Sequence, residues 1–322
     1  MLLKTIKKSI FNPQSSRCFF NNFFTKNNTK ERRLVDNSFG KYEIVTLWNV
    51  SKMHDVPSHI QKPSWYKAWT SEKLPDEIEI KNDIQIEKMR QSCKLAKKIL
   101  NSVELLIEPG VTTDFIDEQI HKLIISYGAY PSPLNYLGYP KSICTSINNV
   151  ACHGIPDDRP LVEGDTLNVD ITVFLNGYHG DCSDMFCVGQ VDSKAKQLIQ
   201  VTRECLDIGI NVCKPDEQFC NIGNAIEEHA NKNGFSVIPV FCGHGIGSYF
   251  HGQPDIYHVG NDLPGVMKAG MVFTIEPVLS QGGTDVKVLE DGWSAVTTDD
   301  SRTAQVEHTI LVTNHGCEIL TC

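Results

Sequence analysis

Apolar residues between Asn82 and Gly128 recur in steps of three and four, which is the spacing of an amphipathic α-helix. The first run predicts a helix that begins near Asn82 and ends before the Pro-Gly pair at 109–110. A second helix should follow, capped by Thr112 or Thr113 and closed by Gly128. The two apolar stripes consist of Ile86, Met89, Cys93, Ala96, Leu100 and Val103, and of Phe115, Ile116, Ile120, Leu123 and Ile124.

Strand-like runs follow these helices, and the same order of elements then returns in the second half of the chain. The further predicted elements are strands at 142–150 and on both sides of 176–177, helices at 195–206 and 222–230, and strands at 235–241, 271–275 and 304–312. Runs of helices followed by runs of strands favour an α+β fold with a largely antiparallel sheet over alternating βαβ units. Each half is expected to contribute its own ligands to a shared site.

The segment from Leu167 to Phe186 predicts a β-hairpin, because two β-rich runs flank the dipeptide Asn176-Gly177. A type I′ turn needs a positive φ at both central residues, and this dipeptide tolerates it. The register follows if the residues next to the dipeptide close the turn. The expected cross-strand pairs are Leu175 with Tyr178, Asp170 with Ser183, and Thr172 with Asp181.

This register places Asp170 and Asp181 as diagonal neighbours on one face of the hairpin. Diagonal residues lie roughly 7–8 Å apart at the backbone. Their carboxylates could therefore converge on two metal ions, which lie about 3.5–4 Å apart in such sites. A solvated hairpin face that carries two acids is the alternative, and the hairpin alone does not decide between them.

Further candidate ligands lie in apolar surroundings in the second half of the chain. His244 stands in a glycine-rich run, and His251 follows seven residues later in what we predict to be the same irregular segment. The run does not open a helix, which argues against a phosphate-binding loop. Glu276 and Glu307 each interrupt an apolar strand, where an unpaired carboxylate is costly. Each residue alone is more often structural, but four acids and one histidine together suit a two-metal hydrolytic site.

Composition and charge narrow the class of protein. The 322 residues are 41% hydrophobic and 21% charged, as is ordinary for a globular protein, and no apolar run is long enough to suggest a membrane span. Residues 1–33 hold eight lysines and arginines against Glu31, so the remainder has 22 basic and 38 acidic residues and a net charge of −16. An acidic body argues against a nucleic-acid partner. The twelve cysteines form no Cys-x-x-Cys pair, which favours reduced thiols.

The N-terminal segments have distinct patterns. Within residues 1–33, Leu2, Ile6 and Ile10 recur at helical spacing among lysines, with almost no acid. This pattern predicts an organelle presequence, and a disordered basic tail is the alternative. Residues 34–80 are mixed and proline-containing, and we expect an extended arm that lies over a main domain at 81–322.

Several motifs together resemble the type 1 methionine aminopeptidases, a branch of the M24 peptidases, and most closely the mitochondrial form. The matching motifs are Cys-His-Gly-Ile-Pro at 152–156, Asp170 and Asp181 eleven residues apart, Gly-His-Gly-Ile-Gly at 243–247 with His251, and Glu276 and Glu307 separated by 31. The resemblance covers about residue 80 to the C-terminus. It fits the mitochondrial form because the presequence pattern is present and the Cys/His zinc-binding extension of the cytosolic eukaryotic enzyme is not seen.

The resemblance implies a pseudo-twofold "pita-bread" fold, with a curved sheet covered by two helix pairs, and a site for two divalent ions, which could be Co, Mn, Fe or Zn. By similarity Asp170 binds one ion, Asp181 and Glu307 bridge both, and His244 and Glu276 bind the other. A metal-activated water would attack the first peptide carbonyl. His153 and His251 would contact the scissile amide and the oxyanion, and Glu276 would belong to the catalytic residues as well as to the metal ligands.

The resemblance also implies a methionine pocket, in which His153 and His251 are joined by soft and aromatic side chains suited to a thioether. Its remaining members are Tyr136, Tyr139, Cys144, Phe250 and Trp293, for two of which, Tyr139 and Trp293, core packing is the alternative. Pro133 stands where bacterial relatives often have cysteine, so the rim of the pocket is expected to differ. Asn148, Val150 and Thr303 match a monovalent-cation site of some relatives.

The expected function is removal of the initiator methionine from nascent proteins, with a preference for a small second residue. We expect a monomer that acts in the mitochondrion rather than the plastid, near the ribosome exit, with no nucleic-acid recognition and no membrane partner. Proline-specific relatives of the same fold, a non-catalytic binding protein and a two-metal phosphoesterase are the alternatives. The intact ligand set argues against the second of these, and the absence of a basic cluster argues against the third.

Overall fold

The computed structural model describes residues 33–67 and 74–322, of which Leu34–Cys322 belong to one compact unit. Apart from Arg33, the predicted presequence lies outside the described residues. The helices are α3 (Asp83–Val103), α4 (Thr113–Ser126), α5 (Ser193–Val212) and α6 (Cys220–Lys232), with 3-10 turns η1 (Ser64–Lys67), η2 (Glu104–Leu106) and η3 (Tyr136–Gly138). None of the helices in the described ranges combines the length and the apolar character needed to cross a bilayer.

A nine-stranded antiparallel sheet forms the centre of the described residues. Its main order is β10-β9-β11-β16-β7-β6-β3, with β17 paired to β16 and β4 paired to β6. The strands are β3 (Tyr130–Pro131), β4 (Cys144–Ile147), β6 (Thr166–Leu175), β7 (Tyr178–Cys187), β9 (Cys242–Gly245), β10 (Gly252–Tyr257), β11 (Val272–Ile275), β16 (Glu307–Val312) and β17 (Cys317–Ile319). Strands from the two halves of the sequence meet where β16 pairs with β7.

Smaller sheets extend this architecture. One has the order β15-β12-β8, another has the order β13-β14-β5, and β1 and β2 form a hairpin. Their strands are β1 (Arg33–Asn37), β2 (Gly40–Ile44), β5 (Val150–Cys152), β8 (Ser236–Val237), β12 (Val278–Ser280), β13 (Val286–Val288), β14 (Ala295–Thr297) and β15 (Thr303–Gln305).

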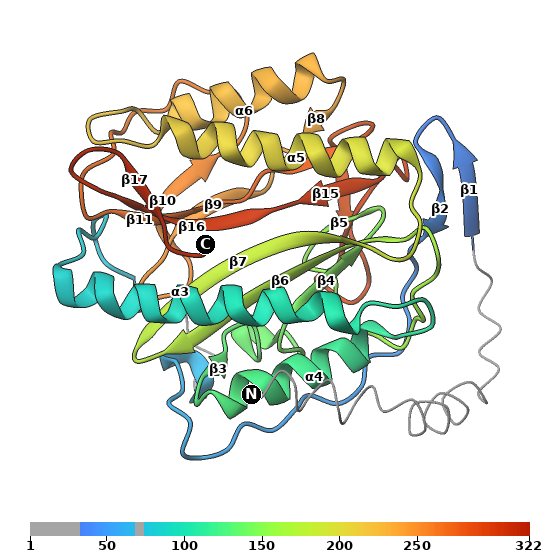
Figure 1. The fold of residues 1–322 in the computed structure, drawn as a ribbon, viewed down its shortest axis with the longest axis horizontal. Helices are drawn as coiled ribbons and strands as arrows, with labels where there is room; N and C mark the ends of the chain where they lie inside the picture. The colour runs from blue at the N-terminus through green and yellow to red at the C-terminus, as the bar shows by residue number, and fades with distance from the viewer. Residues whose placement is uncertain (1–32, 68–73) are drawn as a thin grey trace. The chain divides into compact units, whose positions relative to one another are not determined.

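The two helix pairs accompany the two halves of the sheet, as the repeated order of elements predicts. Figure 1 shows α3 and α4 beside the β6–β7 hairpin, and α5 and α6 on the other side of β16. Apolar side chains of α5 and α6 pack against Phe273 of β11 and Ile310 of β16. Gly180 lets α3 lie close to β7, since a Cβ at this position would stand 2.4 Å from the Cys93 nitrogen. The predicted pseudo-twofold α+β fold is confirmed.

The predicted helix ends agree with the structure because local chemistry determines them. Asn82 caps α3 and exchanges hydrogen bonds with Gln85 in a capping box. The Thr112 hydroxyl accepts from the Phe115 nitrogen at the start of α4. Gly128 and Gly234 follow α4 and α6 with φ of 73° and 78°, which suits glycine.

Three predicted strands and one predicted irregular segment need correction. The run 142–150 breaks into β4 and β5, because Asn148 adopts a φ of 50°. In 235–241 only Ser236–Val237 is a strand, since Pro239 cannot donate to a ladder. The run 304–312 divides at Val306, where the chain leaves the β12 sheet and joins the central one. His244 lies in strand β9 rather than in the irregular segment.

Candidate metal and substrate site

The hairpin β6–β7 has the predicted register. Its cross-strand pairs include Leu175 with Tyr178, Thr172 with Asp181, and Asp170 with Ser183. Both aspartates therefore lie on one face, and the neighbouring charge of Asp170 contributes to the raised pKa of Asp181.

The second half of the chain brings three more polar side chains to the same place. His244 on β9 has its Nε2 3.8 Å from Asp181 Oδ2 and 3.7 Å from Glu276 Oε1, at the end of β11. Glu307, the first residue of β16, pairs with Ser183 and so lies next to Asp181. Asp181, His244 and Glu307 each offer a ligand atom, and these atoms all lie within 4.8 Å of one another.

Electrostatics show that this carboxylate cluster fits a cation. Burial raises the pKa of Asp170 to about 7 and that of Glu276 to about 8. Burial and the neighbouring acids raise the pKa of Asp181 and Glu307 well above the ordinary values. Within the described part of the chain, no lysine or arginine forms an ion pair with any of the four. Two buried acids, Asp181 and Glu307, and two half-buried ones, Asp170 and Glu276, without a basic partner are a candidate donor set for divalent metal.

His244 completes this set as a neutral nitrogen ligand. Burial lowers its pKa to about 4, so the imidazole is uncharged near neutral pH. Its Nδ1 lies 3.3 Å from the Gly245 carbonyl oxygen, which suits a proton on Nδ1. The lone pair of Nε2 then faces the carboxylates. One nitrogen and four carboxylates match the chemistry expected from the sequence.

Hydrogen-bond donors behind the cluster hold the carboxylates in place, and sequence reasoning did not assign these residues. The Thr172 hydroxyl donates to Asp181 Oδ1 at 2.7 Å, and the Thr274 hydroxyl donates to Glu276 Oε1 at 2.8 Å. Gln305 Nε2 donates to Glu276 Oε2 at 3.1 Å. Strand alternation was an available signal for Thr274, which is two residues before Glu276. Gln305 comes from another sheet, so only the tertiary structure identifies it.

One predicted group of pocket residues lies beside Asp170. Cys144 pairs with Asp170 across β4 and β6, and it packs with Tyr139 and Trp293. The rings of Tyr139 and Trp293 meet edge to face at 5.1 Å. Tyr139 is 2% exposed and packs in the core, whereas Trp293 is half-buried. His153, with a φ of 57°, presents its exposed ring 6.2 Å from Trp293.

The other predicted group lies beside His244. The His251 ring is 4.2 Å from the His244 ring and 4.0 Å from the Phe250 ring. The Tyr136 ring is 4.9 Å from Phe250 and 5.1 Å from His251. Burial and the neighbouring imidazoles lower the pKa of His251 well below its usual value, so it too is neutral. The structure thus gathers the predicted pocket residues on two sides of the carboxylate cluster.

The structure also places two further features that the sequence singled out. Pro133 is buried, and its carbonyl accepts from the Tyr136 nitrogen at the start of η3. The Thr303 hydroxyl contacts the carbonyl oxygens of Asn148 and Val150 at 3.1 and 2.9 Å. The three residues predicted from the sequence to bind a monovalent cation, Asn148, Val150 and Thr303, therefore lie together.

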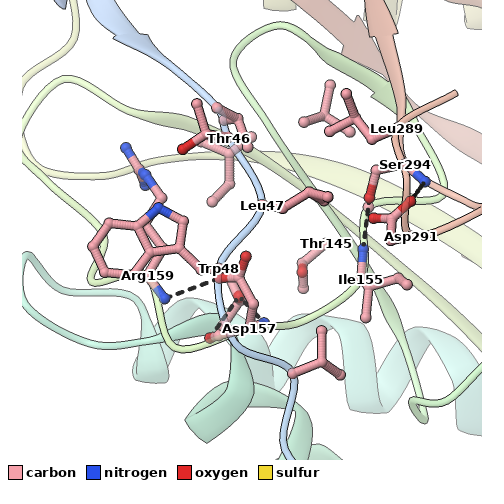
Figure 2. Close-up of a pocket in the computed structure, with 16 residues that line it drawn as sticks. Thr46, Leu47, Trp48, Thr145, Ile155, Asp157, Arg159, Leu289, Asp291 and Ser294 are labelled. Carbon is pink, nitrogen blue, oxygen red and sulfur yellow. Dashed lines mark hydrogen bonds between the residues drawn. The ribbon is translucent and has the colours of Figure 1, made fainter. Parts of the chain in front are cut away.

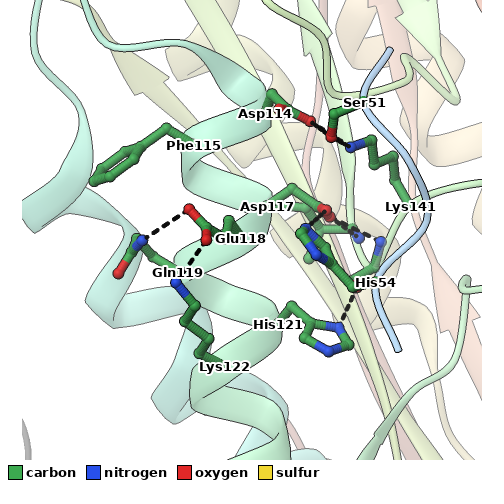
Figure 3. Close-up of polar contacts among 12 residues, drawn as sticks. Ser51, His54, Asp114, Phe115, Asp117, Glu118, Gln119, His121, Lys122 and Lys141 are labelled. Atoms are coloured by element: carbon green, nitrogen blue, oxygen red, sulfur yellow. Dashed lines mark hydrogen bonds and ion pairs between the residues drawn. The ribbon is translucent and has the colours of Figure 1, made fainter. Parts of the chain in front are cut away.

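A buried aspartate on α4, which sequence reasoning missed, supports the pocket from behind. Asp117 is fully buried, and its Oδ1 accepts from the nitrogens of Ser142 and Ile143, just before Cys144. Figure 3 shows His54 of the arm and Lys141 near this aspartate. His54 Nε2 is 3.5 Å from Asp117 Oδ2. The sequence did contain a signal for this role, because Asp117 is an acidic residue on the buried face of the amphipathic helix α4.

The arm also borders a small pocket, separate from the carboxylate cluster (Figure 2). Residues 45–48 of the arm form one side, and Leu289, Asp291 and Ser294 form another. Gly154 and Ile155, which follow His153, line it as well. Residues 45–48 therefore lie across this pocket from part of the 152–156 turn.

Comparisons with known proteins agree with this geometry. The sequence profile of metallopeptidase family M24 matches residues 87–314. The chain is 49% identical over 280 residues to methionine aminopeptidase 1D, mitochondrial, of Homo sapiens, covering 87% of this chain and 84% of the relative. It is 49% identical over 266 residues to methionine aminopeptidase 1B, chloroplastic, of Arabidopsis thaliana, covering 83% and 72%. A crystal structure of methionine aminopeptidase from Rickettsia prowazekii is 46% identical, with a TM-score of 0.75, and covers 76% of this chain and 100% of that chain.

The profile match contains all five predicted metal ligands, from Asp170 to Glu307. Identity near one half extends over most of the chain and most of the human relative. Sequence, fold and the buried carboxylate cluster lead to the same assignment. The chain belongs to metallopeptidase family M24.

Proposed function

We propose that this protein is a metal-dependent methionine aminopeptidase that removes the initiator methionine from nascent polypeptides. The observation that carries this proposal is the contact between the carboxylate cluster and a pocket of thiol and aromatic side chains, through the Cys144–Asp170 pair. A thioether suits such a pocket because sulfur packs favourably against aromatic rings. The names of the human and Rickettsia relatives support the same activity.

Five residues would hold two divalent ions. Asp170 would bind one ion, His244 and Glu276 the other, and Asp181 and Glu307 both. When bound, such ions activate water and polarise a carbonyl at neutral pH. We propose Mn, Fe, Co or Zn, since the donor set has four carboxylates and one imidazole. A monovalent cation at the carbonyls of Asn148 and Val150 would be a separate, structural ion.

Protein groups beside the ions would orient the substrate and move protons. The neutral imidazole of His251 can donate to the developing oxyanion, and the exposed His153 ring can contact the scissile amide. Glu276 is held by Thr274 and Gln305 and can carry a proton from the attacking water to the leaving amine. We also propose a preference for a small second residue, which rests on the resemblance to the type 1 methionine aminopeptidases.

The remaining proposals concern location and partners. We propose that residues 1–33 direct the protein to the mitochondrion, since the basic segment has an apolar periodic face. The plastid is the alternative, because relatives named chloroplastic are equally similar. We also propose a monomer, in which the arm at 34–80 packs on the 81–322 domain and which acts near the ribosome exit.

Chelation and reconstitution test the metal proposal. Removal of divalent ions should abolish hydrolysis of a Met-Gly-x peptide, and Mn or Co should restore it. Restored metal should also raise the melting temperature, since binding at about 100 times Kd stabilises the folded state by about 2.7 kcal/mol. Calorimetry and peptide cleavage measure the two effects.

The same assay separates the alternative activities. Hydrolysis of Gly-Pro-x but not of Met-Gly-x by the reconstituted protein would support a proline-specific enzyme. Release of phosphate from a phosphoester with no peptide cleavage would support the phosphoesterase. Full peptidase activity after complete chelation would contradict the role of the carboxylate cluster.

Removal of residues 1–33 tests the presequence. A fluorescent fusion of the full chain should colocalise with a mitochondrial marker, and the truncated fusion should disperse. As a matched control, replacing only Lys4, Lys7 and Lys8 with glutamine should weaken import without shortening the chain. Unchanged targeting of the truncated fusion would refute this proposal.

A further inference from the structure

Trp65, in the 3-10 turn η1 of the arm, belongs to the aromatic group beside His251. Its ring lies 5.1 Å from the His179 ring and 6.0 Å from the Phe250 ring, with interplanar angles of 17° and 20°. It meets Tyr136 edge to face at 5.1 Å. The side chain is 4% exposed. An arm residue therefore covers the outer side of two predicted pocket residues.

The surface on which Trp65 stacks is continuous with the carboxylate cluster. His179 is two residues before Asp181 on β7, so both side chains lie on the same face of the sheet. Its Nδ1 bonds the Ser132 hydroxyl at 2.8 Å, which fixes the orientation of the ring. The Phe250 ring lies nearly parallel to the His179 ring at 5.3 Å, with an interplanar angle of 8°. Phe250 in turn contacts His251, which contacts His244.

The arm is anchored independently of Trp65. Ile60 packs in a cluster with Tyr130 and Phe174, and Tyr66 packs against the same cluster. The Tyr66 and Tyr130 rings meet edge to face at 5.7 Å. Neighbouring residues of one 3-10 turn thus have different partners. Tyr66 packs on the core cluster of Ile60, Tyr130 and Phe174. Trp65 contacts the predicted pocket residues Tyr136 and Phe250.

The indole of Trp65 belongs to a buried stack of rings. Its Nε1 is buried and has no hydrogen-bond partner among the described residues, and the same is true of His179 Nε2. Buried indole nitrogens usually find an acceptor. Ring packing, and not a hydrogen bond from either of these two nitrogens, therefore holds Trp65 against His179.

We propose that Trp65 is a positioning residue of the substrate pocket, so that the N-terminal arm forms part of the active site. By stacking on His179 and Phe250 and contacting the edge of Tyr136, Trp65 holds the pocket wall in the orientation that receives the N-terminal residue of the substrate. Without this ring, Phe250 and Tyr136 gain rotational freedom, and water reaches the wall. The inference rests on the proposed aminopeptidase function and adds the arm to its binding site.

Steady-state kinetics with the metal-loaded full chain test this inference. Trp65→Ala should raise KM for a Met-Gly-x peptide roughly tenfold, equivalent to about 1.4 kcal/mol, since it removes three aromatic contacts. It should change kcat by less than about threefold, because these contacts do not involve the metal ligands. Trp65→Phe should recover most of the loss, since a phenyl ring can still stack on His179.

Tyr66→Ala is the matched control, since it removes an aromatic ring from the same turn. It should lower the melting temperature and leave KM unchanged, because Tyr66 packs on the core. If Trp65→Ala also lowers only the melting temperature, Trp65 is an ordinary anchor of the arm and the inference is overturned. If the wild-type chain fails to cleave Met-Gly-x after metal loading, the proposed function itself fails. Wild-type cleavage with an unchanged KM in Trp65→Ala refutes the role of Trp65 alone.

Discussion

Replacing Asp181 with alanine should lower kcat for Met-Gly-x by on the order of a thousandfold or more, equivalent to about 4 kcal/mol. Asp181 is the carboxylate at the centre of the cluster: it interacts with Asp170 and lies 3.8 Å from His244 Nε2. It also belongs to the candidate ligand group with Glu307. Its loss should leave the variant deficient in bound metal. Elemental analysis of the purified variant, together with peptide cleavage, measures both effects.

Asp184→Asn provides the matched control for Asp181→Ala. Asp184 lies three residues away on β7 and pairs with Arg203 at 2.8 Å, outside the cluster. The pair is partly exposed, so its loss should cost no more than about 1 kcal/mol of stability. Metal content and kcat should stay near the wild-type values. Full activity in Asp181→Ala would exclude the proposed bridging role.

Replacing Asp117 with alanine should lower the free energy of unfolding by about 2–4 kcal/mol, because two buried N–H groups lose their acceptor. These groups belong to Ser142 and Ile143, which precede Cys144 of the proposed methionine pocket. Urea unfolding of the metal-loaded protein measures the change. Glu118, the next residue on α4, forms an exposed ion pair with Lys122 (Figure 3). Glu118→Ala removes this pair and should lower the free energy of unfolding by at most about 0.5 kcal/mol. Equal effects of the two changes would contradict this account.

Asp117→Asn separates charge from hydrogen bonding. Burial raises the pKa of Asp117 from 3.8 to about 7 in the folded chain, although Lys141 and the two backbone N–H groups act in the opposite direction. A raised pKa contributes stability below about pH 4, and that contribution is lost as the pH rises through 7. The stability of the wild type relative to Asp117→Asn should therefore fall between pH 4 and 7. A difference that stays constant across this range would show that Asp117 is ionised throughout.

Local sequence determined the helices and the central hairpin. Caps such as Asn82 and Thr112 act over three or four residues, so a linear pattern contains them. The turn at Asn176-Gly177 determines the register of β6 and β7 for the same reason, and every predicted pair agrees with the structure. The division at Val306 was missed because a continuous apolar run does not show where a chain changes sheets.

Motif spacing identified the candidate site residues, and the structure brings them together. The resemblance to the type 1 methionine aminopeptidases predicted that ligands from both halves of the chain share one site. Hydrophobic periodicity alone does not predict this. The supporting residues Gln305, Asp117 and Trp65 act through contacts across 29, 25 and 185 positions. Contacts over such separations leave no local pattern in one sequence. They depend on which faces of distant elements pack together.

The sequence by itself determined the hairpin that carries Asp170 and Asp181, because turn chemistry and strand alternation are local. Only the tertiary structure decided that β16 pairs with β7, which places Glu307 beside Asp181. It also decided that β9 brings His244 to the same cluster, and that the arm places Trp65 against Phe250. The physical reason is that burial of apolar faces selects these long-range pairings, whereas the local pattern specifies only which faces are apolar.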